Sequence, residues 1–313
     1  MDAMIRGLHH VTATVNDAQE DLDFYAGVLG QRLVKKTVNF DNNGVYHFYY
    51  GNEAGTPGTI MTTFPYKGMG VRVGTKGAGQ ITVTSFSAPA AAMEFWRRRL
   101  ADAGIAITDE RSAAGEDAIS FNDPSDLRIR IVGVSADDRA PWTVPGIDAT
   151  VAIRGIHSVQ MLTHTPALSI AFLTTMMDAT VTVERGGTTR LALGAGAPGQ
   201  IVEVVQATDA PPAVNGLGTV HHVAFAVATG DEQLRMREEL LHAGANVTEV
   251  RDRQYFTSIY FREPNGILFE IATLPPGFAV DEPPESLGRA LKLPPWEEPN
   301  RATIEARLPS VRY

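Results

Sequence analysis

The chain repeats one pattern four times, and this repetition limits the folds open to it more than any other feature. Each repeat opens with an apolar, strand-like run that follows a glycine, at residues 7–15, 79–86, 155–162 and 218–227. A helical pattern comes after each run, at residues 17–29, 89–103, 167–177 and 231–243. Shorter strand-like runs separated by turn residues complete each repeat. The sequence therefore predicts an α+β fold of four βαβββ modules, each about 55–70 residues long.

Similar sequence segments indicate how the modules alternate. The second and fourth modules close on similar segments, and so do the first and third. The two pairs are Ile119–Arg130 with Ile259–Glu270, and Pro57–Thr62 with Pro198–Glu203. When the two segments of the first pair are aligned, Arg130 occupies the same position as Glu270. The alternation predicts that the four modules are paired into two domains.

The chain has 313 residues, a length that also favours two domains. We place the first domain at residues 1–140 and the second at residues 150–275. The linker between them lies where Asp, Pro and Gly concentrate, around residues 135–151. Residues 276–313 are rich in Pro and charge and are predicted to form a C-terminal arm that wraps the second half.

Two of the strand-like runs begin with the same histidine pair. Leu8–Val15 and Val220–Val227 both carry His-His-Val, so that His10 matches His222. Because a strand alternates its faces, His222 is predicted to share a face with small alanines, with His221 pointing the other way. A single histidine in an apolar strand is usually structural, but the repetition of the pair favours a pair of ligands.

A glutamate completes the candidate site. Glu270 lies in an equally apolar strand, and a buried carboxylate is costly unless it is paired or binds a metal. Two histidines and one carboxylate form the facial triad that holds non-haem Fe(II) and leaves three coordination positions open. His10, His222 and Glu270 are therefore the predicted metal ligands. Replacing Glu270 by glutamine should cost metal affinity or activity at least tenfold.

Composition limits the partners and the compartment. A net charge of −9 argues against unspecific binding to nucleic acid or to an anionic membrane surface. No run approaches the length of a transmembrane helix, and residues 1–6 lack the apolar core of a signal peptide. The absence of cysteine excludes disulfides and thiolate ligands, so nitrogen and oxygen must hold any metal. We expect a cytoplasmic protein without nucleic-acid or membrane partners.

Several motifs together resemble a known group of enzymes. Paired βαβββ modules with His on the first strand and Glu on the last resemble the vicinal oxygen chelate superfamily, which includes glyoxalases, extradiol dioxygenases and antibiotic-binding proteins. The resemblance is closest to the hydroquinone ring-cleaving dioxygenases and runs almost end to end. It is carried by residues 7–10, 45–50, 55–65, 221–227 and 286–288.

The resemblance implies an Fe(II) enzyme that opens a hydroquinone-type aromatic ring with O2, in a fold whose halves each curl round a cup. It implies one composite site, with His10 from the first module and His222 and Glu270 from the fourth. Ser158 stands at the equivalent position of the third module, and Thr82 or a neighbour stands there in the second. The residues that match the family's second coordination sphere are His9, Thr12, His221, Arg253 and Tyr260.

Two other functions stay open from the sequence alone. A glyoxalase-type isomerase or lyase usually uses a fourth protein ligand, whereas only three are found here. A non-catalytic protein that sequesters an aromatic compound or an antibiotic would need no metal triad. The ring substituents, the choice between Fe(II) and Mn(II), the formation of a homo-oligomer, and a catabolic or detoxifying role are not fixed by the sequence.

Overall fold

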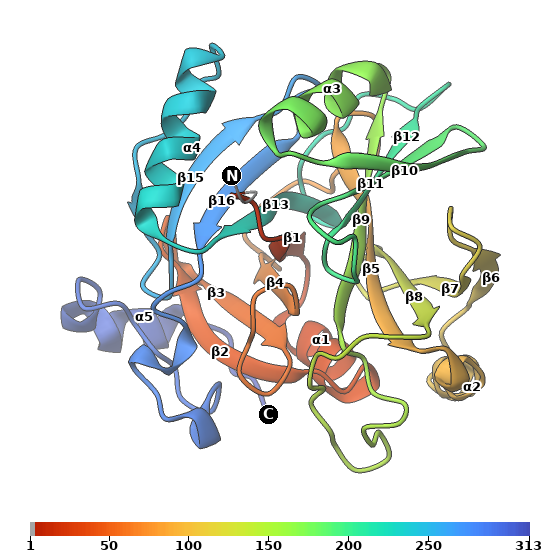
Figure 1. Cartoon of the computed structure of the whole chain (residues 1–313). Coiled ribbons are helices and arrows are strands. Elements are labelled where there is room, and N and C mark those ends of the chain that lie inside the picture. The colour runs from red at the N-terminus through yellow and green to blue at the C-terminus, as the bar shows by residue number, and fades with distance from the viewer. Residues whose placement is uncertain (1–3) are drawn as a thin grey trace.

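The computed structural model describes residues 4–313 and contains all four predicted modules (Figure 1). The first module comprises β1 (Leu8–Val15), α1 (Ala18–Leu22), the π-helical η1 (Asp23–Val28), β2 (Arg32–Asn39), β3 (Asn42–Gly51) and β4 (Ile60–Pro65). The second comprises β5 (Gln80–Pro89), η2 (Ala90–Ala92), α2 (Met93–Asp102), β6 (Thr108–Arg111), β7 (Asp117–Asn122) and β8 (Arg128–Val134).

The third and fourth modules repeat this order and are followed by the arm. The third comprises β9 (Gly155–Thr163), α3 (Pro166–Met176), β10 (Thr180–Arg185), β11 (Thr188–Ala192) and β12 (Ile201–Gln206). The fourth comprises β13 (Thr219–Val227), α4 (Gly230–His242), β14 (Arg251–Asp252), β15 (Thr257–Arg262) and β16 (Leu268–Thr273). The arm carries η3 (Phe278–Val280), η4 (Pro284–Ser286), η5 (Glu298–Asn300) and α5 (Arg301–Arg307).

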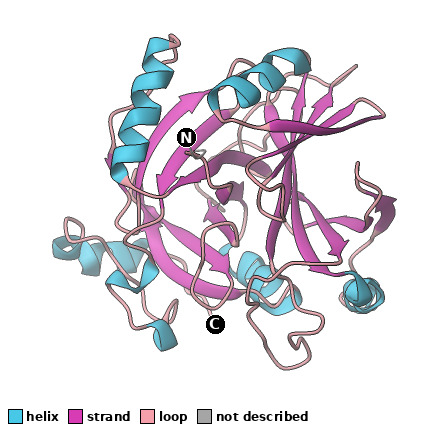
Figure 2. Cartoon of the chain, viewed as in Figure 1, coloured by secondary structure: helices cyan, strands magenta, loops and turns pink. Residues whose placement is uncertain are grey.

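The strands form two curved eight-stranded sheets, with α4 and α2 at opposite sides of the molecule and α1 and α3 between the two sheets (Figures 1 and 2). One sheet has the order β14-β15-β16-β13-β1-β4-β3-β2 and the other the order β10-β11-β12-β9-β5-β8-β7-β6. The prediction that each half of the chain curls round its own cup is wrong, because β1 pairs with β13 and β5 pairs with β9. Each curved sheet forms a cup that combines one module from each half. The first cup joins the first and fourth modules, and the second cup joins the second and third. The domain ranges 1–140 and 150–275 remain a proposal.

The shared Pro-Gly phrase of the first and third modules joins the two sheets. Gly58 and Gly199 have φ values of +85° and +89°, a conformation that glycine adopts without strain. The Gly199 carbonyl accepts a hydrogen bond from Leu8 N at 2.7 Å, and the Gly58 carbonyl accepts one from Ile156 N at 2.9 Å. Each glycine thus lets its own module bond to the first strand of the other.

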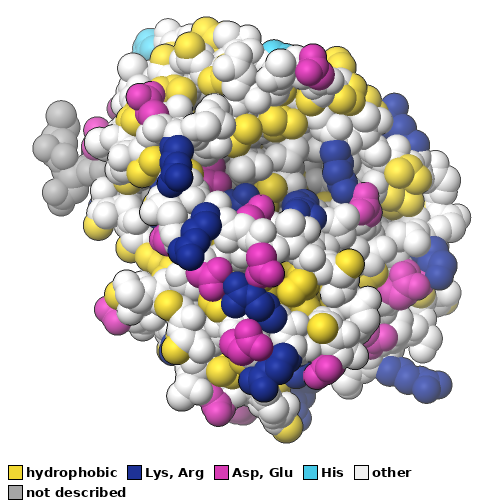
Figure 3. Space-filling view, turned by 90° about the vertical axis from the view of Figure 1, so that its right-hand side faces the viewer, with side chains coloured by type: hydrophobic (Ala, Val, Ile, Leu, Met, Phe, Trp, Pro, Cys, Tyr) yellow, Lys and Arg dark blue, Asp and Glu magenta, His cyan; other side chains and the backbone are white. Residues whose placement is uncertain are grey.

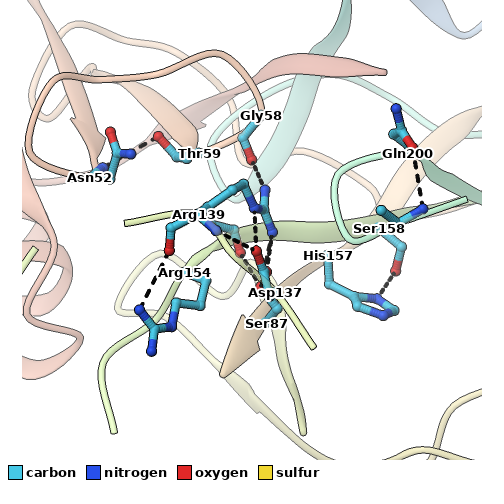
Figure 4. Close-up of polar contacts among 12 residues, drawn as sticks. Asn52, Gly58, Thr59, Ser87, Asp137, Arg139, Arg154, His157, Ser158 and Gln200 are labelled. Carbon is cyan, nitrogen blue, oxygen red and sulfur yellow. Dashed lines mark hydrogen bonds and ion pairs between the residues drawn. The ribbon is translucent and has the colours of Figure 1, made fainter. Parts of the chain in front are cut away.

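The linker is pinned to this junction by Arg139 (Figure 4). Its guanidinium donates to the Gly58 carbonyl at 2.7 Å and to Ser87 Oγ at 3.0 Å. The Asp137 carboxylate neutralises it over distances of 2.9 and 2.6 Å. One partly buried ion pair therefore ties the linker to the first module and to β5.

Most of the arm packs on the first module, and only its start, around Gly277 and Asp281, contacts the fourth, which corrects the prediction that the arm wraps the second half. Leu291 bridges to Lys36 of β2, and Tyr46 OH of β3 donates to the Pro309 carbonyl at 3.0 Å. Gly288 lies so close to β2 that an added Cβ would stand 1.9 Å from the Leu33 carbonyl oxygen. The arm consequently covers the outer edge strand of the first sheet, an edge that would otherwise expose unpaired backbone groups.

None of the helices in residues 4–313 is long and apolar enough to cross a membrane. On the face drawn in Figure 3, basic and acidic side chains are interspersed and no broad patch of one sign forms. The expectation that residues 1–6 are not a signal peptide concerns a segment of which residues 1–3 lie outside the described residues.

Two buried carboxylates lie between the first and second modules. Asp21 Oδ2 accepts hydrogen bonds from Tyr50 OH at 2.7 Å and from Thr63 Oγ1 at 2.6 Å. Asp123 Oδ2 accepts one from Tyr25 OH at 3.1 Å. Burial raises the pKa of Asp21 to about 8 and the pKa of Asp123 to about 6.

We expect Asp21→Asn to flatten the dependence of the unfolding free energy on pH. Because the pKa of Asp21 is about 8 in the folded chain and 3.8 ordinarily, the folded chain keeps a proton that the unfolded chain releases. From this group the wild type should lose about 1.4 kcal/mol of stability per pH unit as the pH rises between these two values. Asparagine resembles the protonated carboxyl and carries no such proton. Urea unfolding of both proteins between about pH 5 and pH 8 tests this, and equal slopes would mean that Asp21 is ionised in the folded chain.

Candidate metal centre

The three predicted ligands converge in the sheet that combines the first and fourth modules. His10 on β1, His222 on β13 and Glu270 on β16 are 2%, 6% and 0% exposed. His10 Nε2 and His222 Nε2 lie 3.3 Å apart, and Glu270 Oε2 lies 3.4 Å from the first and 2.8 Å from the second. Within residues 4–313, no second group of three His, Asp or Glu side chains converges this closely.

The spacing and chemistry of these atoms fit a divalent metal ion. Bonds of about 2.1 Å that meet at right angles would place neighbouring donor atoms about 3 Å apart. No described residue donates a hydrogen bond to Glu270 Oε2, whereas Ser258 Oγ donates to the other carboxylate oxygen. Burial alone would raise the pKa of Glu270, but His10 and His222 hold that pKa well below its usual value. The site therefore offers one carboxylate oxygen and two imidazole nitrogens to a cation.

Each ligand histidine is hydrogen-bonded by the histidine before it. His9 Nδ1 lies 2.9 Å from His10 Nδ1, and His221 Nδ1 lies 2.8 Å from His222 Nδ1. Burial, followed by the neighbouring histidine, lowers the pKa of His9 and of His221 to about 3. Both rings are therefore neutral near pH 7 and can accept the Nδ1–H of the ligand. That hydrogen bond leaves the ligand's Nε2 lone pair free for a metal.

The position of His221 corrects the prediction that it points away from His222. In the pairing of β1 with β13, Leu8 faces Phe225 but His10 faces Ala224, so His9 is an extra residue. The same pairing skips His221 between Thr12 and Ala13. An extra residue forms a β-bulge, which breaks the strict alternation of faces. The two bulges thus bring both histidines of each pair to one side.

A cavity of about 360 Å³ opens over the metal-binding atoms. Its walls are largely aromatic, and polar groups stand at its mouth. The lining includes Phe40, His47, Tyr49, Phe64, Tyr66, Phe256, Leu268, Asn39, Asp41 and Arg251, together with His221, His222, Arg253, Tyr260 and Glu270. The Phe256 ring lies 4.9 Å from the His9 ring and 5.3 Å from the His10 ring, centre to centre. The cavity is large enough for a substituted aromatic ring.

Arg253 and Tyr260 form one polar wall of this cavity. Arg253 Nε donates to Tyr260 OH at 3.0 Å, and its guanidinium lies 5.1 Å from the centre of that ring. Tyr260 pairs directly with Glu270 across β15 and β16, and its ring meets the His222 ring edge-on at 5.8 Å. Burial and the Glu270 carboxylate raise the pKa of Tyr260 above its usual value. The phenol therefore stays protonated and can donate a hydrogen bond into the cavity.

Thr12 lies opposite His222 in the strand register and is fully buried. Its hydroxyl accepts a hydrogen bond from Thr62 Oγ1 at 2.9 Å, and Thr62 Oγ1 lies 2.9 Å from His47 Nε2. His47 lines the cavity, and burial lowers its pKa well below the usual value. Asn39, Tyr66 and Phe256 also line the cavity and carried no sequence signal, because they come from loops and strand ends.

The second cup has the same bulges without the ligands. The pairing of β5 with β9 skips Thr82 and His157, so these residues take the places of His221 and His9 in the first cup. Val83 and Ser158 then stand where the two histidine ligands stand. His157 Nδ1 lies 3.0 Å from Ser158 Oγ, in the same relation as within the histidine pairs (Figure 4).

A cation of the protein itself occupies the equivalent of the glutamate position in this second cup. Arg130 faces Ser85 as Glu270 faces Ala224 in the first cup. Arg130 NH1 binds Glu203 Oε2 at 3.0 Å, and Arg130 Nε binds Glu110 Oε1 at 2.6 Å. The second cup is thus closed by an internal ion network.

Paired βαβββ modules whose sheets curl into cups are the fold of the vicinal oxygen chelate class of protein. The sequence model of the Glyoxalase/Bleomycin resistance protein/Dioxygenase superfamily matches residues 7–131 and 155–271. The chain belongs to this superfamily.

Relatives and solved structures agree with this assignment. The chain is 44% identical over 305 residues to the ring-cleaving dioxygenase MhqE of Bacillus subtilis, with 97% of this chain and 99% of that protein covered. It is 36% identical over 302 residues to the chlorohydroquinone/hydroquinone 1,2-dioxygenase of Sphingobium indicum, with 94% and 93% covered. A Bacillus subtilis crystal structure described as a dioxygenase superposes with a TM-score of 0.95 at 41% identity, over 99% of this chain and 98% of that chain. Glyoxalase I from Zea mays shares the fold, with a TM-score of 0.62 at 12% identity over 85% and 92% of the chains.

Proposed function

We propose that this chain is an Fe(II)-dependent ring-cleaving dioxygenase that opens a substituted hydroquinone with O2. The observation that supports the proposal most is the convergence of His10 Nε2, His222 Nε2 and Glu270 Oε2 beneath an aromatic cavity. This donor set is typical of non-haem Fe(II) oxygenases, because it leaves coordination positions open. The reaction class is supported by relatives named as ring-cleaving and hydroquinone dioxygenases.

In this proposal the ligands are held by the groups behind them. His9 and His221 accept the Nδ1–H bonds of His10 and His222 and so fix their ring orientation. Ser258 holds the second oxygen of Glu270. A ferrous ion bound there would supply the redox chemistry that lets O2 oxidise an electron-rich ring.

The cavity residues bind and orient the ring. The walls of Tyr49, Phe64 and Phe256 exclude water and pack against an aromatic face. Arg253 is a fixed cation that stabilises a substrate oxyanion, and Tyr260 donates a hydrogen bond to the same oxygen. Thr12 lies opposite His222 and accepts the hydrogen bond from Thr62, which in turn contacts His47, so Thr12 fixes the position of this polar group of the cavity wall.

The proposed reaction balances without another reductant. The carbon–carbon bond beside a hydroxylated carbon breaks, and each of the two carbons gains one atom of O2. The ring itself supplies the electrons, so the aromatic substrate and O2 are the only reactants.

The test is anaerobic purification, metal analysis, and then O2 uptake with a panel of hydroquinones and catechols. We expect about one iron per chain and O2 uptake with hydroquinones but not with catechols. Reconstitution with Mn(II) instead of Fe(II) would show which metal supports turnover. Metal without O2 uptake, together with isomerisation of a thiol–aldehyde adduct, would favour a glyoxalase-type reaction. An absence of metal with tight aromatic binding would favour sequestration.

A further inference from the structure

A buried lysine outside the metal site connects the first module to the C-terminal arm. Lys35 on β2 is fully buried, and a buried ammonium is costly unless it is paired. Its Nζ lies 2.7 Å from Asp281 Oδ1 and 2.8 Å from Glu282 Oε2. Both partners belong to the C-terminal arm. The arm therefore has to be docked for this charge to be compensated.

The same arm also reaches the turn that carries Arg253. Asp281 Oδ2 accepts a hydrogen bond from Tyr255 OH at 3.1 Å, so the carboxylate binds Lys35 with one oxygen and Tyr255 with the other. Lys35 Nζ also lies 5.0 Å from the centre of the Tyr255 ring. The Tyr255 carbonyl accepts a second bond from the arm, from Gly277 N at 2.9 Å.

Tyr255 lies in a tight turn whose two ends line the cavity. Gln254 has a φ of +65°, which is uncommon for a residue other than glycine. Arg253 N donates to the Phe256 carbonyl at 2.9 Å and closes the turn. Arg253 and Phe256 line the cavity on either side of Tyr255, and Phe256 packs on the His9 and His10 rings. A shift of this turn would move both walls together.

We propose that Tyr255 and Asp281 are positioning residues of the active site, through which the C-terminal arm fixes the Arg253–Phe256 turn against the metal centre. This role rests on the proposed dioxygenase function, since Tyr255 and Asp281 act through Arg253, the residue that binds the substrate oxygen in that proposal. Neither side chain touches the metal ligands. Their effect on the reaction passes through Arg253 and Phe256.

The test uses Tyr255→Phe in the full-length, iron-loaded protein. The ring, which packs 5.0 Å from Phe278, is retained and only the hydroxyl bond to Asp281 is lost. We expect amide hydrogen exchange in residues 253–256 to become about fivefold faster. We also expect kcat/KM for a hydroquinone to fall about tenfold, with iron content unchanged, because a small misplacement of a positioning group has a large effect on rate.

Tyr46→Phe is the matched control. It makes the same chemical change and removes the bond from Tyr46 OH to the Pro309 carbonyl, an arm contact on β3 outside the turn. Exchange at residues 253–256 and kcat/KM should both stay within about twofold of the wild type in this variant. Exchange in β9, in the other sheet, should not change in either variant.

Asp281→Asn is the second variant and decides the question if Tyr255→Phe does not fold. It keeps the shape of the side chain but weakens its bonds to Lys35 and Tyr255, so exchange at the turn should again rise. Unchanged exchange in the variants that fold, or an equal effect of Tyr46→Phe, would overturn the proposal. If the wild type takes up no O2 with any ring, the dioxygenase function fails, while the exchange measurement on the same proteins still decides whether the arm holds the turn.

Discussion

Replacing Glu270 by glutamine is expected to lower the affinity for a divalent metal ion, and with it O2 uptake, at least tenfold. Glutamine fills the same space and its amide oxygen can still accept the bond from Ser258, so the local packing is kept. The change removes the single negative charge of a fully buried donor set whose two histidines would bind a metal as neutral imidazoles. In such a site, charge attraction is strong because little solvent screens it. Metal content after dialysis and anaerobic titration with Fe(II) measure the loss.

A second measurement separates loss of metal from loss of fold. Without metal, the Glu270→Gln protein should still fold but be somewhat less stable than the metal-free wild type, because the lowered pKa of Glu270 means that the folded chain favours an ionised carboxylate, which glutamine does not supply. Glu263→Gln is the matched control. Glu263 is equally buried in the same module, but it binds Ser169 and the backbone of its own turn. Retention of full metal affinity and turnover by Glu270→Gln would remove this residue from the ligand set.

The convergence of the three candidate ligands could be predicted from the sequence because two modules carry the same histidine motif. His10 and His222 begin equivalent strands of two modules, and Glu270 interrupts an apolar strand where only a compensated charge is tolerated. The relation between Arg130 and Glu270 could also be predicted, since the closing phrases of their modules align, and the strand registers agree with that alignment. These features depend on local sequence and repeat symmetry.

What could not be predicted depends on contacts between distant segments or on broken periodicity. The bulges at His9 and His221 each add one residue to a strand, and a two-residue period cannot show them. The resemblance implies that the first and fourth modules share one site, but the local pattern does not show that β1 pairs with the distant β13 in a single sheet. The cavity wall around Phe256 depends on an arm residue, Asp281.

The two cups compensate a buried charge at equivalent positions in two different ways. At equivalent positions of the two sheets, the first cup buries a carboxylate among imidazoles and the second buries a guanidinium among carboxylates. In the first cup, Glu270 Oε2 has no hydrogen-bond donor among the described residues. In the second, Arg130 is bound by Glu203 and by Glu110. The first cup therefore leaves the countercharge of its buried carboxylate to an external cation, whereas the second supplies its own cation in Arg130.

This contrast predicts that Arg130→Met will destabilise the chain by about 3–5 kcal/mol, because removing one member of a buried ion pair leaves the other charged and uncompensated. Glu203, with a side chain 2% exposed, would lose its partner, while Glu110, at 29%, stays in contact with water. The melting temperature of the metal-free protein should fall by roughly 10 °C. Metal affinity should change little, because the ligands belong to the other sheet.

The double variant Arg130→Met, Glu203→Met should recover most of that loss, because an apolar pair of similar volume avoids burying charge. Arg128→Met, on the same strand, is the matched control; Arg128 is only partly buried, so its replacement should change stability by about 0.5 kcal/mol or less. A single variant as stable as the wild type would show that Glu203 is already neutral in the folded chain. In that case Arg130 would not be the internal counterpart of a metal ion.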